Sequence, residues 1–500
     1  MTRQATQNRR RWICTLVALS LTASLTVAEA ADVPADGTLL GTFTNAPTAD
    51  PQQPGSEPWR WWDEARLGIF FHFGPESLTT TSLRDVYHGV PYDATAKKQQ
   101  KEQYGWPQWR AVFSDPANRK KVLETFNPEK FDARQIVANV RKIGGRYIVF
   151  TAIHHDGFAN WDTAMHDFKS TKTRCGKNLC AELGAACKEA KMPLMWYVGT
   201  RGAFSGTPAE KLVDPQDPKR SVDTVFRDRV IDELLRTYPD TAGFWWDEGF
   251  DARQVSHAYY AAKYGRGDLI FVSNGRQQGA VRCFEKRTDG FNRSQRWEKC
   301  TTFLNFWFWE YPTPYPDDAS VLRSFLNTLV EMAGNDGNSL IDLALAPEGS
   351  FEPNLQKAVD LCGSWMERYG AAIYGSRGGP RQRGIFYEQK PAYTRDNQRM
   401  EKFNSTCKGK MMYLFVWDWA KQDRIEMPAL PAKIVTFKTL SGGNGLVEND
   451  EKSLRVTRPK EGENPKDIFT CFAIELDQEA FSIPPVFGLA VEQSPEKAKP

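Results

Sequence analysis

The chain has 500 residues, enough for two or three domains or for one large barrel with an additional module. Its 65 basic and 62 acidic residues leave a net charge of +3, which argues against nucleic acid or an anionic membrane as the main partner. Small neutral ligands are compatible with this charge. The 16 Trp, 16 Tyr and 30 Phe residues suit such ligands, because flat rings stack on apolar ligand faces as well as on one another.

The first 30 residues have the pattern of a cleavable secretory signal. Three arginines precede an apolar segment over residues 12–27, and Ala28-Glu29-Ala30 supplies small residues for cleavage. We expect a mature protein that is secreted or periplasmic and has no membrane span, and residues 31–57 predict a linker or arm. Eight cysteines follow the signal, and the candidate disulfides are Cys175 with Cys180 and Cys283 with Cys300.

Strand-like and helix-like segments alternate over residues 58–378. In chain order we expect a strand over 67–73, a helix over 132–143, a strand over 147–153, a helix over 179–190, a strand over 192–198, a helix around 230–237, and strands over 243–246 and 269–272. This alternation predicts parallel strands in an α/β fold, and the number of repeats favours a closed (β/α)8 TIM-like barrel. Pro353 is expected to open the last barrel helix, which ends near Gly370.

The pattern changes after residue 378, where short strand-like runs alternate with turn residues. These runs lie at 411–417, 433–439, 453–457 and 468–476. They predict a C-terminal antiparallel β-sandwich over residues 379–480. Residues 481–500 are expected to form a polar tail.

Polar side chains directly follow three of the predicted barrel strands. His72 follows one apolar run, His154 and His155 follow the next, and Asp247 ends a third behind two tryptophans. The C-terminal strand ends of such a barrel carry the active site in essentially every characterised enzyme of this fold. The sequence therefore predicts an enzyme, with a structural role for Asp247 as the cap of the next helix as the alternative.

Seven short motifs occur in order between about residues 58 and 478. They are Ala65 to Gly74, Thr151 to Asp162, Trp245-Trp246-Asp247, Ser273-Asn274-Gly275-Arg276, Arg296 to Thr302, Gly334 to Asn338, and Tyr369 to Tyr374. Together these motifs resemble the α-L-fucosidases of glycoside hydrolase family 29. Seven ordered matches are far more specific than any one of them.

The resemblance implies a retaining mechanism, in which one carboxylate attacks the anomeric carbon and a second protonates the leaving oxygen and then activates water. It assigns the nucleophile to Asp247 and the acid/base to Glu298, with Glu285 and Asp289 as fallback candidates. The two carboxyl groups then have to lie about 5 to 5.5 Å apart. The alternative for Glu298 is an ion pair with a neighbouring arginine or lysine. Arg276 would keep the nucleophile ionised or orient substrate oxygens, unless it forms a salt bridge at the barrel rim.

His72, His154 and His155 correspond to residues that hydrogen-bond the fucose hydroxyls in the family, a role that suits imidazole because it can donate and accept. Metal ligation by the adjacent pair is the alternative. Successive residues on an ideal strand point in opposite directions, and no third ligand lies at a familiar spacing, so neither a metal nor a cofactor is expected. Tyr197 and Trp245 are expected beneath the apolar edge of the sugar, or else as plain barrel packing.

The sequence therefore predicts an exported, exo-acting, retaining α-L-fucosidase whose partner is a fucosylated oligo- or polysaccharide. Three alternatives stay open. The protein could hydrolyse a related L-configured or deoxy sugar, it could be a non-catalytic glycan-binding protein that keeps the site, or it could be a metal-dependent hydrolase built on the histidine pair. The sequence does not indicate an oligomeric state.

Overall fold

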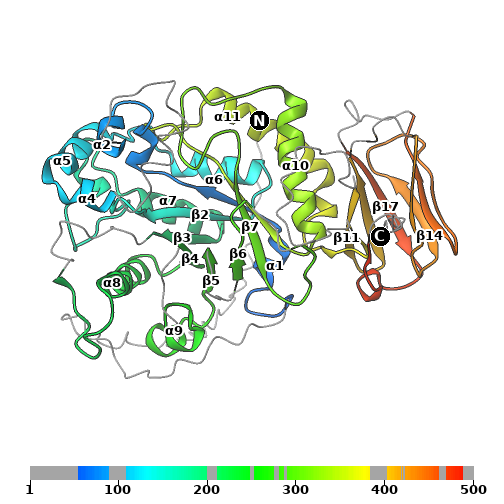
Figure 1. Cartoon of the computed structure of the whole chain (residues 1–500), viewed down its shortest axis with the longest axis horizontal. Helices are drawn as coiled ribbons and strands as arrows, with labels where there is room; N and C mark the ends of the chain where they lie inside the picture. The colour runs from blue at the N-terminus through cyan, green and yellow to red at the C-terminus, as the bar shows by residue number, and fades with distance from the viewer. Residues whose placement is uncertain are drawn as a thin grey trace, which may run out of the picture. The chain divides into compact units, whose positions relative to one another are not determined.

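The computed structural model describes residues 54–88, 109–199, 211–247, 253–274, 281–286, 290–382, 403–417, 419, 423–460 and 469–487. A closed barrel of eight parallel strands, hydrogen-bonded in chain order, forms its first part (Figure 1). The barrel strands are β1 (Leu67–Phe71), β2 (Tyr147–Ile153), β3 (Leu194–Val198), β4 (Gly243–Asp247), β5 (Ile270–Asn274), β6 (Val281–Cys283), β7 (Trp297–Thr302) and β8 (Asn338–Asp342). The predicted barrel is confirmed.

Helices cover the outside of the barrel, and Figure 1 shows α6 to α9 around its strands. The helices are α1 (Arg60–Ala65), α2 (Arg84–His88), α4 (Trp109–Ser114), α5 (Pro116–Thr125), α6 (Ala133–Lys142), α7 (Leu179–Ala190), α8 (Val222–Thr237), α9 (His257–Tyr264), α10 (Asp318–Gly334) and α11 (Pro353–Tyr369). Short 3-10 helices are η1 (Pro75–Leu78), η4 (Ser170–Lys172), η6 (Arg253–Val255), η7 (Gly370–Ala372) and η10 (Ala480–Ser482).

The strands form where the sequence has runs of β-branched and aromatic residues. All seven residues of β2 are buried, as expected for a parallel strand that is covered on both faces. The helix α7 begins where the Asn178 side chain accepts a hydrogen bond from the Ala181 backbone N–H, which satisfies one of the unpaired donors of its first turn. Both β2 and α7 have the bounds that the sequence predicts, whereas β3 begins two residues later than expected, at Leu194.

Alternate residues of each barrel strand face opposite sides, as the two-residue period of a strand requires. One set packs in a core shared with the surrounding helices, and the other packs inside the barrel. The inward set includes Phe70, Tyr197, Trp245, Val272 and Cys283. Residues two positions apart on a strand face the same side. The residues two positions after these inward side chains therefore also face the barrel axis, and at four strand ends they are His72, Asp247, Asn274 and Glu285.

Gly68 on β1 makes room for a large side chain in the barrel. It pairs with Tyr147 of β2, and a Cβ atom at position 68 would lie only 2.2 Å from the tyrosine ring. The absence of a side chain on Gly68 therefore allows the Tyr147 ring to lie across the barrel interior, where its hydroxyl reaches Glu298 on β7.

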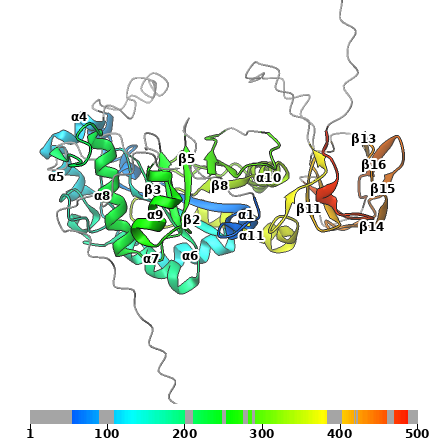
Figure 2. The same ribbon diagram turned by 90° about the horizontal axis from the view of Figure 1, so that it is seen from below.

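Three further sheets form the C-terminal part of the structure (Figure 2). A five-stranded antiparallel sheet has the order β14-β17-β12-β11-β9, a three-stranded antiparallel sheet has the order β13-β16-β15, and β10 pairs with β18. The strands are β9 (Arg377–Gly378), β10 (Arg381–Gln382), β11 (Phe403–Lys408), β12 (Met411–Val416), β13 (Arg424–Pro428), β14 (Ile434–Thr439), β15 (Val447–Asn449), β16 (Ser453–Thr457), β17 (Thr470–Leu476) and β18 (Val486–Phe487). The predicted antiparallel C-terminal domain is confirmed, and β9, β10, β11, β13, β15 and β18 are additional strands.

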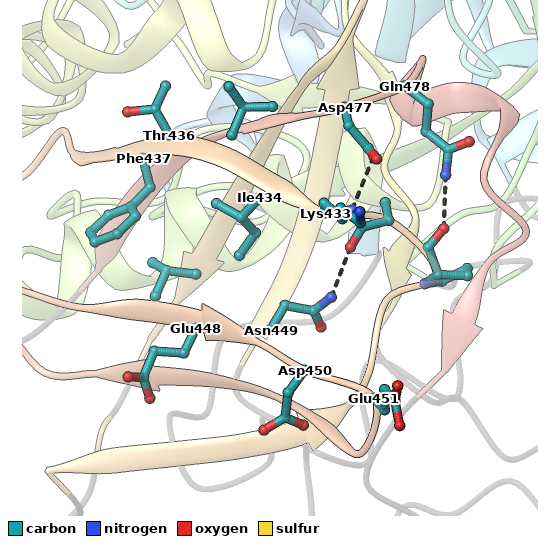
Figure 3. A pocket seen from close by; sticks show the side chains of 14 residues that line it. Lys433, Ile434, Thr436, Phe437, Glu448, Asn449, Asp450, Glu451, Asp477 and Gln478 are labelled. Carbon is teal, nitrogen blue, oxygen red and sulfur yellow. Dashed lines mark hydrogen bonds between the residues drawn. The ribbon is translucent and has the colours of Figure 1, made fainter.

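An open groove of about 900 Å³ lies between β14 and β15, which are edge strands of two different sheets (Figure 3). The Lys433 backbone N–H beside it donates to Asp477 Oδ1 at 3.0 Å. The Asn449 amide donates to the carbonyl oxygens of Leu430 and Ala432, both at 2.9 Å. These hydrogen bonds fix the segment that leads into β14 against the end of β15, so the groove has a defined shape.

The eight cysteines of the described residues are all free thiols, so neither candidate disulfide is present. Cys180 is buried within the first turn of α7, while the Sγ atom of Cys175 contacts the Thr173 hydroxyl at 3.4 Å. Cys283 and Cys300 lie on neighbouring strands as buried thiols. The predicted signal and residues 31–53 of the predicted arm lie outside the described residues. No helix within the described ranges is long and apolar enough to cross a bilayer.

Candidate active site

Asp247, the last residue of β4, lies at the centre of a hydrogen-bonded cluster. Its Oδ2 atom accepts from the Tyr197 hydroxyl at 2.7 Å and lies 3.1 Å from His155 Nε2, which must donate because an ionised carboxylate can only accept. Its Oδ1 atom accepts from Asn274 Nδ2 at 3.0 Å. A carboxylate has about four acceptor positions, so these three donors leave one open, on Oδ1.

These donors also set the charge of Asp247. Burial by itself raises the pKa of this carboxyl. The hydrogen bond and charge of His155, together with the hydrogen bonds of Tyr197 and Asn274, outweigh the effect of burial and lower the pKa to about 2. The side chain is 18% exposed. Asp247 is therefore an ionised, oriented and partly accessible carboxylate at neutral pH, which is the state that an attacking carboxylate needs.

His72 is held in one orientation by a carboxylate that the sequence analysis did not identify. Asp342, the last residue of β8, accepts through Oδ1 from the His72 backbone N–H at 3.1 Å and from its ring Nδ1 at 2.8 Å. Because Nδ1 carries the shared proton, Nε2 is the ring atom that remains for a ligand. Burial raises the pKa of Asp342 to about 6, against the lowering effect of His72. The position of Asp342 at a strand end is the signal that could have identified it.

His154 lies beside a buried pair of acids. Its Nδ1 atom is 2.9 Å from Glu76 Oε1. Burial and the neighbouring charge of Asp156 raise the pKa of Glu76 well above its usual range, and burial raises that of Asp156 to about 6. Burial, with the nearby His155 and His72, lowers the pKa of His154, which is therefore neutral at pH 7 and able to both donate and accept.

Aromatic rings surround the histidines and Asp247. Tyr197 stacks on Trp245 with 5.4 Å between ring centroids, and Trp245 packs against Phe70 at 5.0 Å. The ring of Trp307 lies 4.9 Å from His72, and that of Phe308 lies 5.0 Å from His154. Tyr197 and Trp245 pack in the barrel core, which is one of their two predicted roles, and the Tyr197 hydroxyl also donates to Asp247.

Glu298 lies below this cluster, inside the barrel, and is 0% exposed. One carboxyl oxygen accepts from Trp245 Nε1 at 2.7 Å and the other from the Tyr147 hydroxyl at 2.8 Å. The neighbouring bases bind other acids: Arg296 pairs with Asp63 at 2.7 Å, and Lys299 with Glu331 at 3.7 Å. The structure therefore contradicts the ion-pair alternative for Glu298.

Glu285, two residues beyond the end of β6, is the carboxyl group that the structure brings next to Asp247. Its Oε2 atom lies 3.3 Å from Asn274 Nδ2, the same nitrogen that donates to Asp247 Oδ1 at 3.0 Å. The two carboxyl oxygens are thus no farther apart than the sum of these distances. A retaining glycosidase needs about 5 to 5.5 Å between its two carboxyl groups, and this arrangement is compatible with that spacing.

Two predicted site residues, Arg276 and Asp289, lie outside the described residues. Within the ranges that the structure describes, no group of three or more His, Cys, Asp or Glu side chains is arranged to hold a metal ion. The nitrogens of the adjacent histidines instead lie beside separate carboxyl groups, His154 beside Glu76 and His155 beside Asp247.

The buried position of Glu298 gives the fold a pH dependence. Burial raises its pKa from 4.5 to about 7, although the Trp245 and Tyr147 hydrogen bonds oppose this shift. Because the folded state holds this proton more tightly than the unfolded state, protonation of Glu298 stabilises the fold, and the effect is complete below pH 4.5. This contribution to the free energy of unfolding, up to about 3 kcal/mol, is lost as the pH rises to about 7. Glu298→Gln removes the titration while it keeps an acceptor and a donor. Urea unfolding should show wild type losing stability relative to this variant between pH 4.5 and 7.5, and parallel profiles would contradict the assignment.

The chain is similar in sequence to known α-L-fucosidases. The family model for α-L-fucosidase matches residues 44–371, which contain the entire barrel. An α-L-fucosidase of Dictyostelium discoideum is 22% identical over 343 residues, which are 63% of this chain and 71% of the relative. The tissue α-L-fucosidase of Rattus norvegicus is 25% identical over 348 residues, covering 64% of this chain and 70% of the relative.

Solved structures show the same fold. A bacterial fucosidase with an iminocyclitol inhibitor aligns with a TM-score of 0.63 at 18% identity, over 86% of this chain and 98% of that one. A family 29 α-L-fucosidase of Bacteroides thetaiotaomicron, trapped as a covalent intermediate with 2-fluoro-fucosyl fluoride, aligns with a TM-score of 0.62 over the same shares. With a family model that covers most of its length, the chain belongs to the α-L-fucosidases of glycoside hydrolase family 29 and is a glycoside hydrolase.

Proposed function

We propose that the protein removes terminal α-L-fucose from oligo- or polysaccharides with retention of configuration, and that Asp247 is its nucleophile. The observation that carries the proposal is the set of three donors that keep Asp247 ionised and leave one lone pair of Oδ1 for attack. A related enzyme forms a covalent intermediate with a fluorinated fucosyl compound, which supports the same mechanism for this chain. The buried rings behind Asp247 favour an exo-acting enzyme that binds one terminal sugar.

For the acid/base we propose Glu285 rather than Glu298. A group that protonates the leaving oxygen has to reach it directly or through one water, so geometry is tested before pKa. Both oxygens of Glu298 are occupied by donors inside the barrel. Glu285 is exposed and shares Asn274 with Asp247, which supports a position beside the scissile bond. Asp289 stays a candidate from the sequence.

The reaction follows from these two roles. Asp247 Oδ1 attacks the anomeric carbon while the protonated Glu285 gives its proton to the glycosidic oxygen, so the aglycone leaves as an alcohol. The resulting fucosyl ester of Asp247 is attacked by water, whose proton passes to the Glu285 carboxylate. Two inversions give overall retention, and both carboxyl groups return to their starting state.

We assign recognition of the sugar hydroxyls to His72, His154 and His155. Asp342 leaves Nε2 of His72 as the ligand-binding atom, and neutral His154 can both donate and accept. Tyr197 and Trp245 are buried in the barrel core, so we assign them the support of His154 and Asp247 rather than contact with the sugar. Arg276 stays a candidate for the substrate oxygens. The signal-like sequence pattern of residues 1–30 supports secretion or a periplasmic location.

Proton NMR during hydrolysis of 4-nitrophenyl α-L-fucoside tests the proposal. We expect the α anomer of fucose to appear first and the β anomer to follow only by mutarotation, because two displacements restore the starting configuration. The β anomer as first product would overturn retention. Binding of fucose without any turnover would favour a non-catalytic glycan-binding protein. Faster cleavage of another L-configured or deoxy sugar would change the assigned substrate. Loss of activity in chelator, with rescue by zinc, would favour a metal-dependent hydrolase.

A further inference from the structure

The loop after β7 places an aromatic side chain at the edge of the candidate site. Phe306 is 37% exposed, in contrast to its neighbours Trp307 and Phe308, which are buried. Large apolar side chains are usually withdrawn from water, and a ring left open beside an active site provides a stacking surface for a ligand. Phe306 takes no part in the chemistry assigned to Asp247 and Glu285.

One route of contacts connects Phe306 with the histidines. Its ring centroid lies 6.4 Å from that of Trp307, and the Trp307 ring lies 4.9 Å from that of His72. The Nζ atom of Lys286 lies 4.3 Å from the Phe306 centroid and 5.0 Å from the Trp307 centroid, distances typical of cation–π contacts. Phe306 and Lys286 therefore contact the same Trp307 ring that His72 contacts within the candidate site.

A second, independent route connects Lys286 with the two proposed catalytic carboxyl groups. Lys286 directly follows Glu285, which shares the Asn274 amide with Asp247. Lys286 has a left-handed backbone conformation (φ 54°), which is uncommon for a residue other than glycine. The chain thus turns sharply between Glu285, which faces Asn274, and Lys286, which faces Phe306.

We infer that Phe306 and Lys286 form the subsite for the sugar to which fucose is attached. The inference rests on the proposed function. If Glu285 protonates the glycosidic oxygen, the departing sugar lies beyond Glu285, where Lys286 and Phe306 are. Phe306 would stack on the apolar C–H face of the pyranose ring, and the Lys286 ammonium would donate to its hydroxyls.

Two substrates with the same fucosyl group separate this inference from the proposed function. α-L-Fucosyl fluoride has a leaving group of one atom, which cannot contact Phe306, whereas 2′-fucosyllactose places galactose in the subsite. For Phe306→Ala we expect a roughly fivefold to tenfold loss of kcat/KM for 2′-fucosyllactose and no loss for the fluoride, since one aromatic contact is removed. Phe306→Trp should retain both activities, and Lys286→Gln should lower only the lactoside value.

Phe481 on η10 offers a matched control outside the barrel. It is 38% exposed, and the guanidinium carbons of Arg293 and Arg377 each lie 4.4 Å from its ring centroid. Phe481→Ala should leave the ratio of the two activities unchanged. Equal losses for both substrates in Phe306→Ala, or no loss for either, would overturn the subsite. A wild type that is inactive on the fluoride would overturn the proposed function instead.

Discussion

Asp247→Gly is expected to lower kcat/KM for 4-nitrophenyl α-L-fucoside by roughly 10⁴-fold or more, because the attacking group is lost while the surrounding donors remain. Added azide should restore turnover, since the small anion can occupy the space that the carboxylate vacates. The azide then attacks the anomeric carbon directly, in one displacement. The product should be β-fucosyl azide, with inverted configuration, and NMR of the isolated product checks it.

Asp247→Asn is the matched control for this experiment. The amide keeps the volume of Asp247 but not its charge, and it leaves no room for azide, so we expect inactivity without rescue. Thermal unfolding of both variants is the folding control. A variant that unfolds near the wild-type temperature but is inactive has lost catalysis and not its fold. An Asp247→Gly variant that retains activity, or that gives the α-azide, would assign the nucleophile to another residue.

Glu285→Ala is expected to separate substrates by their leaving groups. Loss of the general acid should cost roughly 10²- to 10⁴-fold for 2′-fucosyllactose, whose leaving sugar needs a proton. The loss should be much smaller for 2,4-dinitrophenyl α-L-fucoside, whose leaving group departs without one. Azide should accelerate the second reaction by attacking the fucosyl ester of Asp247, and the product should be the α-azide, with retained configuration.

Glu298→Gln is the parallel variant for the second candidate. Its amide can accept from Trp245 Nε1 and donate to the Tyr147 hydroxyl, so the barrel interior stays paired. If Glu285 is the acid/base, Glu298→Gln should change the activity toward both substrates by a similar factor. A large loss for 2′-fucosyllactose with little loss for 2,4-dinitrophenyl α-L-fucoside, seen in Glu298→Gln and not in Glu285→Ala, would return the role to Glu298.

Several elements follow from local sequence because burial on both faces selects continuous apolar runs. The bounds of β2 are predicted correctly for this reason. Those of α7 follow instead from its capping residue Asn178 and from buried residues that recur at helical spacing. Strands β7 and β8 are harder to recognise, since Glu298 interrupts the first and Asn338 begins the second. Their polar residues face the barrel interior and are satisfied there by partners distant in sequence, such as Tyr147, which no local pattern indicates.

The sequence by itself determined the barrel, the antiparallel C-terminal domain, the family, and the positions of His72, His155 and Asp247 at strand ends. Of the two described candidates for the second acid, only the tertiary structure shows that Glu285, and not Glu298, shares a donor with Asp247. Cys283 of β6 pairs in register with Glu298 of β7, so Glu285 lies two residues, about 6.6 Å, closer to the C-terminal end of the barrel. How deep a side chain lies in a barrel depends on how far neighbouring strands are shifted along one another. This shift is a property of the closed sheet and is not encoded by any one residue.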